Sequence, residues 1–172
     1  MAALNKDRNT TVKMGVLASF PVAASVKIYA GSLVCINGDG FARPAVDTAG
    51  LKFVGVSQEY VDNSGGANGD VRVKVMRDGV CDFAATGMGD DDVDKPVFIL
   101  DDQTVGLSSN NGVGCGIISE VESATKVWID IAPANTRTGK AQADSTAVDV
   151  AGLKDDLNSL LAKLRAARLI GS

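Results

Sequence analysis

A change of hydrophobic period near the C-terminus constrains this chain most. The apolar residues of that region recur at alternating steps of three and four, namely Val150, Leu153, Leu157, Leu160, Leu164 and Ala167. This spacing predicts a helix over residues 147–170 whose apolar side chains form one stripe, at the a and d positions of a short heptad pattern. A polar linker, residues 134–146, precedes the helix. Because so narrow a stripe has little to bury against within its own chain, the pattern favours self-association of identical helices.

The same pattern bears on how many copies associate. Leu161 lies at an e position and widens the stripe, which suits three or more helices. The residues predicted to hold the oligomer are therefore Val150, Leu153, Leu157, Leu160, Leu161 and Leu164. A helix of at most three heptads is marginal alone, so the rest of the chain must contribute to the association. The alternative is an amphipathic helix that packs back on its own chain.

The start of this helix has two notable features. Ser145 or Thr146 is predicted to cap the first turn, because a hydroxyl oxygen can accept a hydrogen bond from an unpaired helix N–H. Gly152 is expected to weaken that turn by about 1 kcal/mol relative to Ala. Gly171 is expected to end the helix.

Residues 13–133 carry a different pattern, with short strand-like runs separated by glycine-rich turns. Within residues 71–76, three valines alternate with other side chains, which predicts a strand with one solvent-exposed face. The segment 37–40 has the Asn-Gly sequence of a tight hairpin turn, and Pro21 is expected to break the first run. Such runs recur about every ten residues. The sequence therefore predicts a mainly β fold, a small barrel or sandwich, followed by the helix.

Composition excludes several classes of protein. The net charge is -4 and the basic residues are scattered, whereas nucleic-acid binding needs clustered Lys and Arg. No apolar run approaches the roughly 18–20 residues of a membrane span, and the N-terminus lacks the apolar core of a signal peptide. Cys35, Cys81 and Cys115 are unevenly spaced in apolar or glycine-rich runs. We expect buried, reduced thiols and synthesis in a reducing cytoplasm.

Residues that could carry chemistry are few. The chain has no histidine, which removes the commonest general base and the commonest metal ligand. The spaced glycines of residues 112–116 lead into a β-branched run, so they predict a turn and not a phosphate-binding loop. Asp90, Asp91, Asp92 and Asp94 could attract a hard cation, but their spacing matches no EF-hand loop and a solvated acidic loop is favoured. We expect neither an enzyme nor a cofactor or metal site.

Several segments resemble, in this order, the capsid cement (head decoration) proteins of tailed bacteriophages. These segments are Ile28–Val34, Asn37–Phe41, Gly55-Val56, Pro96–Val105, Gly116–Ile118 and Val127–Ile131. The C-terminal run, Val150–Ile170, is similar to the terminal helical segment of phage head-fibre proteins. The likeness covers most of the chain and consists of strand-and-turn patterns without a catalytic signature.

The resemblance implies a small β-barrel that binds the outer surface of an assembled capsid as a trimer and bridges subunits of the major capsid protein. It implies a place on the virion, without a membrane or nucleic-acid partner. The polar N-terminal arm, residues 1–12, could then add a strand to an edge of the shell. The arm residues expected to bind the capsid are Leu4, Asn5, Lys6, Arg8, Thr10 and Val12.

Two other classes remain open from the residues. A tail, baseplate or fibre adaptor would share the β-domain and the helical bundle but would sit elsewhere on the virion. A carbohydrate-binding module for host surface glycans would present exposed aromatic side chains. Trp128 alternates with Val127 and Ile129 in its strand, and it could face either side of the sheet.

Overall fold

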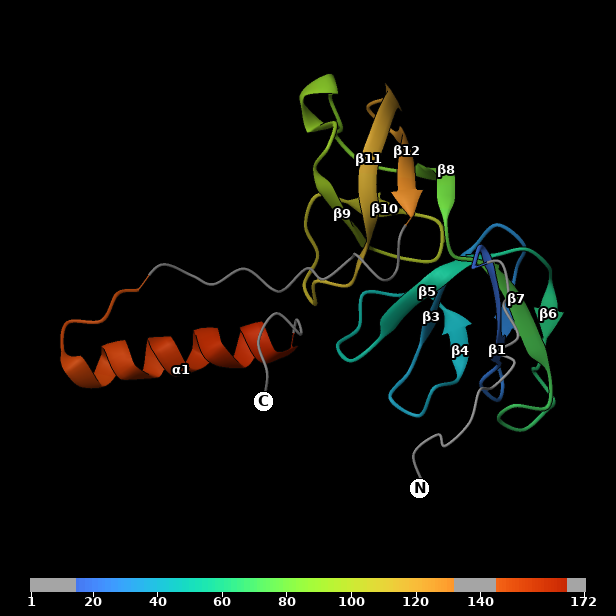
Figure 1. Ribbon diagram of the computed structural model, residues 1–172, viewed down its shortest axis with the longest axis horizontal. Helices are drawn as coiled ribbons and strands as arrows, with labels where there is room; N and C mark the ends of the chain where they lie inside the picture. The colour runs from blue at the N-terminus through green and yellow to red at the C-terminus, as the bar shows by residue number, and fades with distance from the viewer. Residues whose placement is uncertain (1–14, 132–144, 167–172) are drawn as a thin grey trace, which may run out of the picture.

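The computed structural model describes residues 15–131 and 145–166. It shows a mainly β protein with one C-terminal helix, which confirms that part of the predicted fold (Figure 1). The predictions for the arm at residues 1–12 and for linker residues 134–144 lie outside the described residues. Among the described residues, no helix combines the length and the apolar character that a bilayer crossing needs.

The first half of the β-region forms an antiparallel five-stranded sheet. Its strands, in spatial order, are β1 (Leu17–Pro21), β7 (Arg72–Met76), β5 (Lys52–Ser57), β3 (Leu33–Ile36) and β4 (Ala42–Pro44). An isolated parallel bridge between Val22 and Ala42 joins the end of β1 to β4, so the sheet curls into a half-barrel whose outer strands meet at one end. A two-stranded ribbon, β2 (Lys27–Ile28) and β6 (Val61–Asp62), accompanies it.

The second half forms another antiparallel five-stranded sheet. Its spatial order is β8 (Gly79–Ala84), β12 (Lys126–Ile131), β11 (Gly114–Ser123), β9 (Pro96–Ile99) and β10 (Val105–Gly106). A parallel bridge between Ala84 and Thr104 brings its outer strands together in the same way. A short 3-10 turn, η1 (Asp90–Asp92), lies between β8 and β9.

The second half repeats the strand order of the first. In chain order, β8, β9, β10, β11 and β12 correspond to β1, β3, β4, β5 and β7. Each half has a bulge in its fourth strand immediately before a glycine, Gly55 in β5 and Gly116 in β11. A Cβ atom at either glycine would overlap the carbonyl oxygen of the last strand, that of Met76 in β7 or Asp130 in β12. The two glycines are therefore needed for the same close approach of backbones.

Two apolar clusters form the core. The smaller cluster fills the first half alone and includes Val34, Val54 and Val73. The larger cluster takes Leu33 and Phe53 from the other faces of β3 and β5 and joins them to the second half. Because β3 and β5 are buried on both faces, they read as continuous apolar runs.

The predictions made for the turn at residues 37–40, the strand at residues 71–76 and the break at Pro21 agree with the structure. Residues 37–40 form the predicted turn between β3 and β4, and the predicted alternation places Val73 and Val75 in the core. Pro21 is the last residue of β1, so the first run ends at this proline, as predicted. It is accommodated there because β1 is an outer strand, and its missing N–H faces away from β7.

The cysteines are free. Cys35 and Cys115 are fully buried, and Cys81 is half-buried. Burial raises the pKa of Cys35 to about 12 and shifts the pKa of Cys115 in the same direction. Both buried thiols therefore pack as small apolar side chains, as predicted.

The helix α1 spans Val150–Ala166, and its N-cap differs from the prediction. Neither Ser145 nor Thr146 caps it, because the Asp149 carboxylate accepts the Gly152 N–H at 2.8 Å. The Ser145 hydroxyl instead bonds the carboxylate of Asp156, so the segment before α1 folds back along its first turns. A Cβ at Gly152 would lie 3.0 Å from that of Ala147, which gives this glycine a packing role.

Candidate interaction surfaces

The predicted stripe of α1 is exposed in the single chain. The exposed fractions are 82% for Val150, 54% for Leu153, 55% for Leu157 and 36% for Leu160. Leu161 and Leu164 are half-buried. Both apolar clusters of the β-region are built without residues of α1, and Figure 1 draws the helix apart from the two sheets. The helix does not bury these four side chains against its own chain, so packing against another surface would stabilise it.

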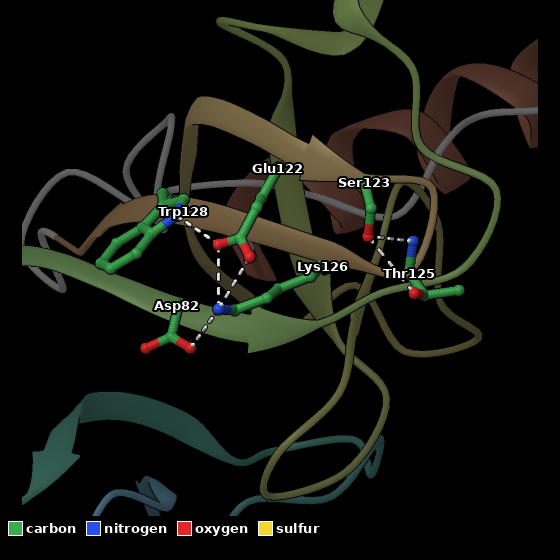
Figure 2. A network of polar contacts seen from close by, with 6 residues as sticks. All are labelled: Asp82, Glu122, Ser123, Thr125, Lys126 and Trp128. Carbon is green, nitrogen blue, oxygen red and sulfur yellow. Dashed lines mark hydrogen bonds and ion pairs between the residues drawn. The ribbon is translucent and has the colours of Figure 1, made fainter.

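A polar network lies on the outer face of the second sheet (Figure 2). Lys126 contacts Glu122 at 2.9 Å and Asp82 at 3.4 Å. The Trp128 indole N–H donates to Glu122 at 3.0 Å, and the Lys126 ammonium lies 5.6 Å from the centre of the Trp128 ring. These contacts link three neighbouring strands and hold the indole in place.

The opposite charges of Lys126 and Glu122 each stabilise the ionised form of the other side chain. The Lys126 ammonium, with a smaller contribution from the Trp128 N–H, lowers the pKa of the Glu122 carboxyl below its usual value. Glu122 in turn raises the pKa of Lys126. Each group therefore stays ionised across the neutral range.

Trp128 faces outward, which settles a question that sequence reasoning left open. Its neighbours Val127 and Ile129 are fully buried, so the alternation of the strand places the indole on the opposite face. The sequence held the signal for this, because Lys126 and Asp130 share the parity of Trp128 and are polar. Since one ring face is near Lys126 and the N–H is taken by Glu122, the indole acts mainly as a packing group.

A shallow groove of about 430 Å³ lies beside this network. One wall is the outer edge of β8 with Trp128, and the other is formed by Gly31 and Ser57 of the first half. Val56, Met76 and Phe83 contribute apolar surface. Among the described residues that line the groove, Asp82 alone is charged. Sequence reasoning missed this groove because its walls come from segments far apart in the chain.

Two exposed tyrosines flank the β2–β6 ribbon of the first half, Tyr29 directly after β2 and Tyr60 directly before β6. The rings of Tyr29 and Tyr60 pack with centroids 5.3 Å apart. The Tyr60 hydroxyl donates to Asp62 at 3.1 Å, and Lys27 pairs with Asp62 at 2.9 Å. Hydrogen bonds from Ser64 lower the pKa of Asp62 well below its usual range, with a further contribution from Lys27. The tyrosine pair is thus fixed on the surface by its own strand neighbours.

The acidic loop is a structural turn. Asp92 is buried, and its carboxylate accepts the Gly89 N–H at 2.9 Å and the Lys95 ammonium at 2.7 Å. These bonds lower the pKa of Asp92, with Lys95 as the largest cause. In residues 15–131 and 145–166, no group of three or more Asp, Glu or Cys side chains is arranged to hold a metal ion.

The predicted site residues divide into two groups. The six residues of the stripe lie on α1, four of them exposed. The six arm residues, Leu4, Asn5, Lys6, Arg8, Thr10 and Val12, precede the described part of the chain. Comparisons of this chain with protein-family models, with curated proteins and with solved structures find no match.

Proposed function

We propose that this protein is a structural component of a phage virion, which binds the outer surface of the capsid as a trimer and stabilises the shell by bridging major capsid protein subunits. The exposed stripe of α1 carries the proposal. An apolar stripe left open on a helix attached to a packed β-region is suited to a partner helix of the same sequence. Each leucine that becomes fully buried there contributes about 2 kcal/mol.

The β-region would supply the contacts with the shell. Three linked copies bind a repeating surface far more tightly than one copy, because the second and third contacts form at high effective concentration. Weak individual contacts then suffice, and they demand no catalytic group. The arm residues remain the predicted shell contact, through strand addition to an edge of a capsid subunit.

Self-association is tested on the stripe. Replacing Leu157 and Leu160 with Asp places two charges per chain, and so six in a trimeric seam, and the oligomer should dissociate to monomers in sedimentation. The matched control replaces Asn158 and Ser159, which lie on another face of α1, with Asp, and this variant should keep its mass. An unchanged mass for the leucine variant would show that the helix packs elsewhere.

Shell binding is tested by co-sedimentation with empty capsids. The full chain should pellet with the shells at a fixed ratio, and a chain lacking residues 1–12 should stay folded and oligomeric in solution while losing that binding. Full-length protein that remains in the supernatant at high concentration would refute the decoration role. Capsid binding without the arm would refute the role of the arm alone.

A further inference from the structure

The outer edges of β1 and β8 occupy equivalent places in the two halves, but they are protected differently. In β1, the Arg72 guanidinium donates to the carbonyl oxygen of Ser19 at 2.7 Å, and Pro21 removes the next outward N–H. In β8, Asp82 and Ala84 stand at the places of Ser19 and Pro21, and neither device is present. Proteins normally protect long outer strands, because an open edge invites pairing with another chain.

The hydrogen-bond pattern identifies the open groups of β8. The Ala85 N–H donates to Thr125 beside β12, whereas the Ala84 N–H donates to Gln103 on the opposite side. By alternation, Cys81 and Phe83 pair with β12, and the N–H and C=O groups of Val80 and Asp82 point away from it. No group in the described part of the chain forms a hydrogen bond with these two N–H and two C=O groups. Val80 itself is 51% exposed, and both residues line the groove.

We propose that the β8 edge accepts a strand from the N-terminal arm of a neighbouring copy, through residues 10–14. This inference rests on the self-association proposed above. The segment Thr10-Thr11-Val12-Lys13-Met14 has β-branched residues and alternating character suited to a strand. The first thirteen residues hold three basic side chains against one acidic one. Asp82, the charged residue among the described groove lining, pairs with Lys126 through Oδ2, and its Oδ1 is left for a basic side chain of the arm.

Within one chain, the start of β1 lies on the side of β7 away from the open edge of β8, which disfavours pairing of the arm with its own β8. The Arg77 N–H donates to the carbonyl oxygen of Val16 at 2.7 Å, so the chain leaves β1 along one side of β7. Beyond the bend at Asp78, β12 occupies that side, because Ile131 pairs with Gly79. The open edge of β8 lies on the other side. A neighbouring copy avoids this obstacle, and passing each arm to the next copy closes a ring.

Strand exchange is compatible with shell binding by the same segment. A strand laid along β8 keeps its own second edge open, and that edge can pair with a strand of the shell. Backbone pairing would place alternate arm side chains over Val56, Met76 and Trp128 in the groove. The arm would then tie the copies together in addition to the helices.

Amide hydrogen exchange tests the proposal. In the full chain, the amides of Val80 and Asp82 should exchange at least about tenfold more slowly than in a chain that begins at Gly15, and a synthetic peptide of residues 5–14 should restore the protection. The amides of Leu17 and Ser19, at the equivalent edge, serve as the internal control and should not change. Equal exchange at Val80 and Asp82 with and without the arm would overturn the proposal.

Cross-linking identifies the source of the strand. With Cys81 replaced by Ser, oxidation of full chains carrying Asp82→Cys and a cysteine at Thr11 or Val12 should give covalent multimers, because paired strands bring Cα atoms within disulfide range. The matched control carries Ser19→Cys in place of Asp82→Cys and should remain monomeric under denaturing conditions. Links closed within one chain, or none from either arm position, would overturn the assignment to a neighbouring copy.

The two proposals fail separately. Sedimentation of the leucine variant reports on the helix, and capsid pelleting reports on shell binding. A protein that is oligomeric and binds shells, yet shows no arm-dependent protection of β8, refutes this inference alone. A protein that is monomeric, does not bind shells and protects the β8 amides with the arm of its own chain would refute both the proposed function and the exchange of arms between copies.

Discussion

The two halves of the β-region share one strand order but differ in how their last two strands are connected. In the second half, β11 and β12 are joined by a tight hairpin at residues 123–126. In the first half, β5 and β7 are separated by residues 58–71, which carry β6 and a loop held by the buried Asn63. The common elements are the glycine that follows the bulge in each half and the parallel bridge that joins the outer strands of each sheet. The comparison teaches that the close approach of the fourth and last strands at a glycine is common to both halves. The connection between these two strands differs, and in the first half it carries the β6 segment on the surface.

The glycines give the largest expected effect. Gly55→Ala should destabilise the protein by about 3 kcal/mol or more, because the added Cβ overlaps the Met76 carbonyl and the residue has a φ of 141°. Gly116→Ala should cost somewhat less, since it meets the Asp130 carbonyl without a positive φ. Urea unfolding measures both. Gly65→Ala is the control, because its Cβ would enter open space and stability should change by less than about 0.5 kcal/mol. A loss no larger than that of the control at either Gly55 or Gly116 would contradict the equivalence of the two positions.

Two neighbouring residues of β3 pack in different apolar clusters, one that spans both halves and one that belongs to the first half alone. Leu33 packs in the cluster that spans both halves, and Val34 packs in the cluster of the first half. Leu33→Ala should cost about 3 kcal/mol and lower amide protection in both halves, because it leaves a cavity between them. Val34→Ala should cost about 1.5 kcal/mol and affect mainly the first half. Equal loss of protection in both halves from either variant would argue against two distinct clusters.

Acid sensitivity gives the smallest effect, and it is expected in both halves. The folded-state pKa values of Asp62 and Asp92 are lowered, so each contributes stability above its ordinary carboxyl pKa of about 4 and loses it as the pH falls through the lowered value. Asp62→Asn and Asp92→Asn should each flatten the acid limb of the stability curve while leaving its slope above pH 7 unchanged. Thermal melting between about pH 2 and pH 9 measures this. A stability curve that stays as steep below pH 4 in both variants would show that these carboxylates are not the source.

Local periodicity was enough to predict the individual elements. The last strand begins at Lys126 and ends at Ile131, as its alternation indicates, and the stripe of α1 follows directly from the leucine spacing. The N-cap was misplaced because Ser145 and Thr146 are good capping residues, yet Asp149 stands next to the first helical residue and takes the role. Such choices depend on where the chain turns, which periodicity does not fix.

The repeated strand order and the groove were not predicted, because both depend on pairings between distant segments. β1 pairs with β7, so the register of Leu17 with Met76 joins residues far apart in the sequence. The two glycines and their carbonyl partners resemble each other only once the strands are aligned in space. The arm residues and most of the linker lie outside the described structure, and their predicted roles await the experiments above.

The core shared by Leu33 and Phe53 has a consequence for how the protein is made. During synthesis the first half leaves the ribosome while the surface it must cover is still missing, so those side chains stay in water until β8 to β12 follow. A fragment that stops at Asp78 would expose this apolar surface to solvent and is expected to aggregate. The two halves thus repeat one strand order, but the first half needs the second to bury its apolar side chains.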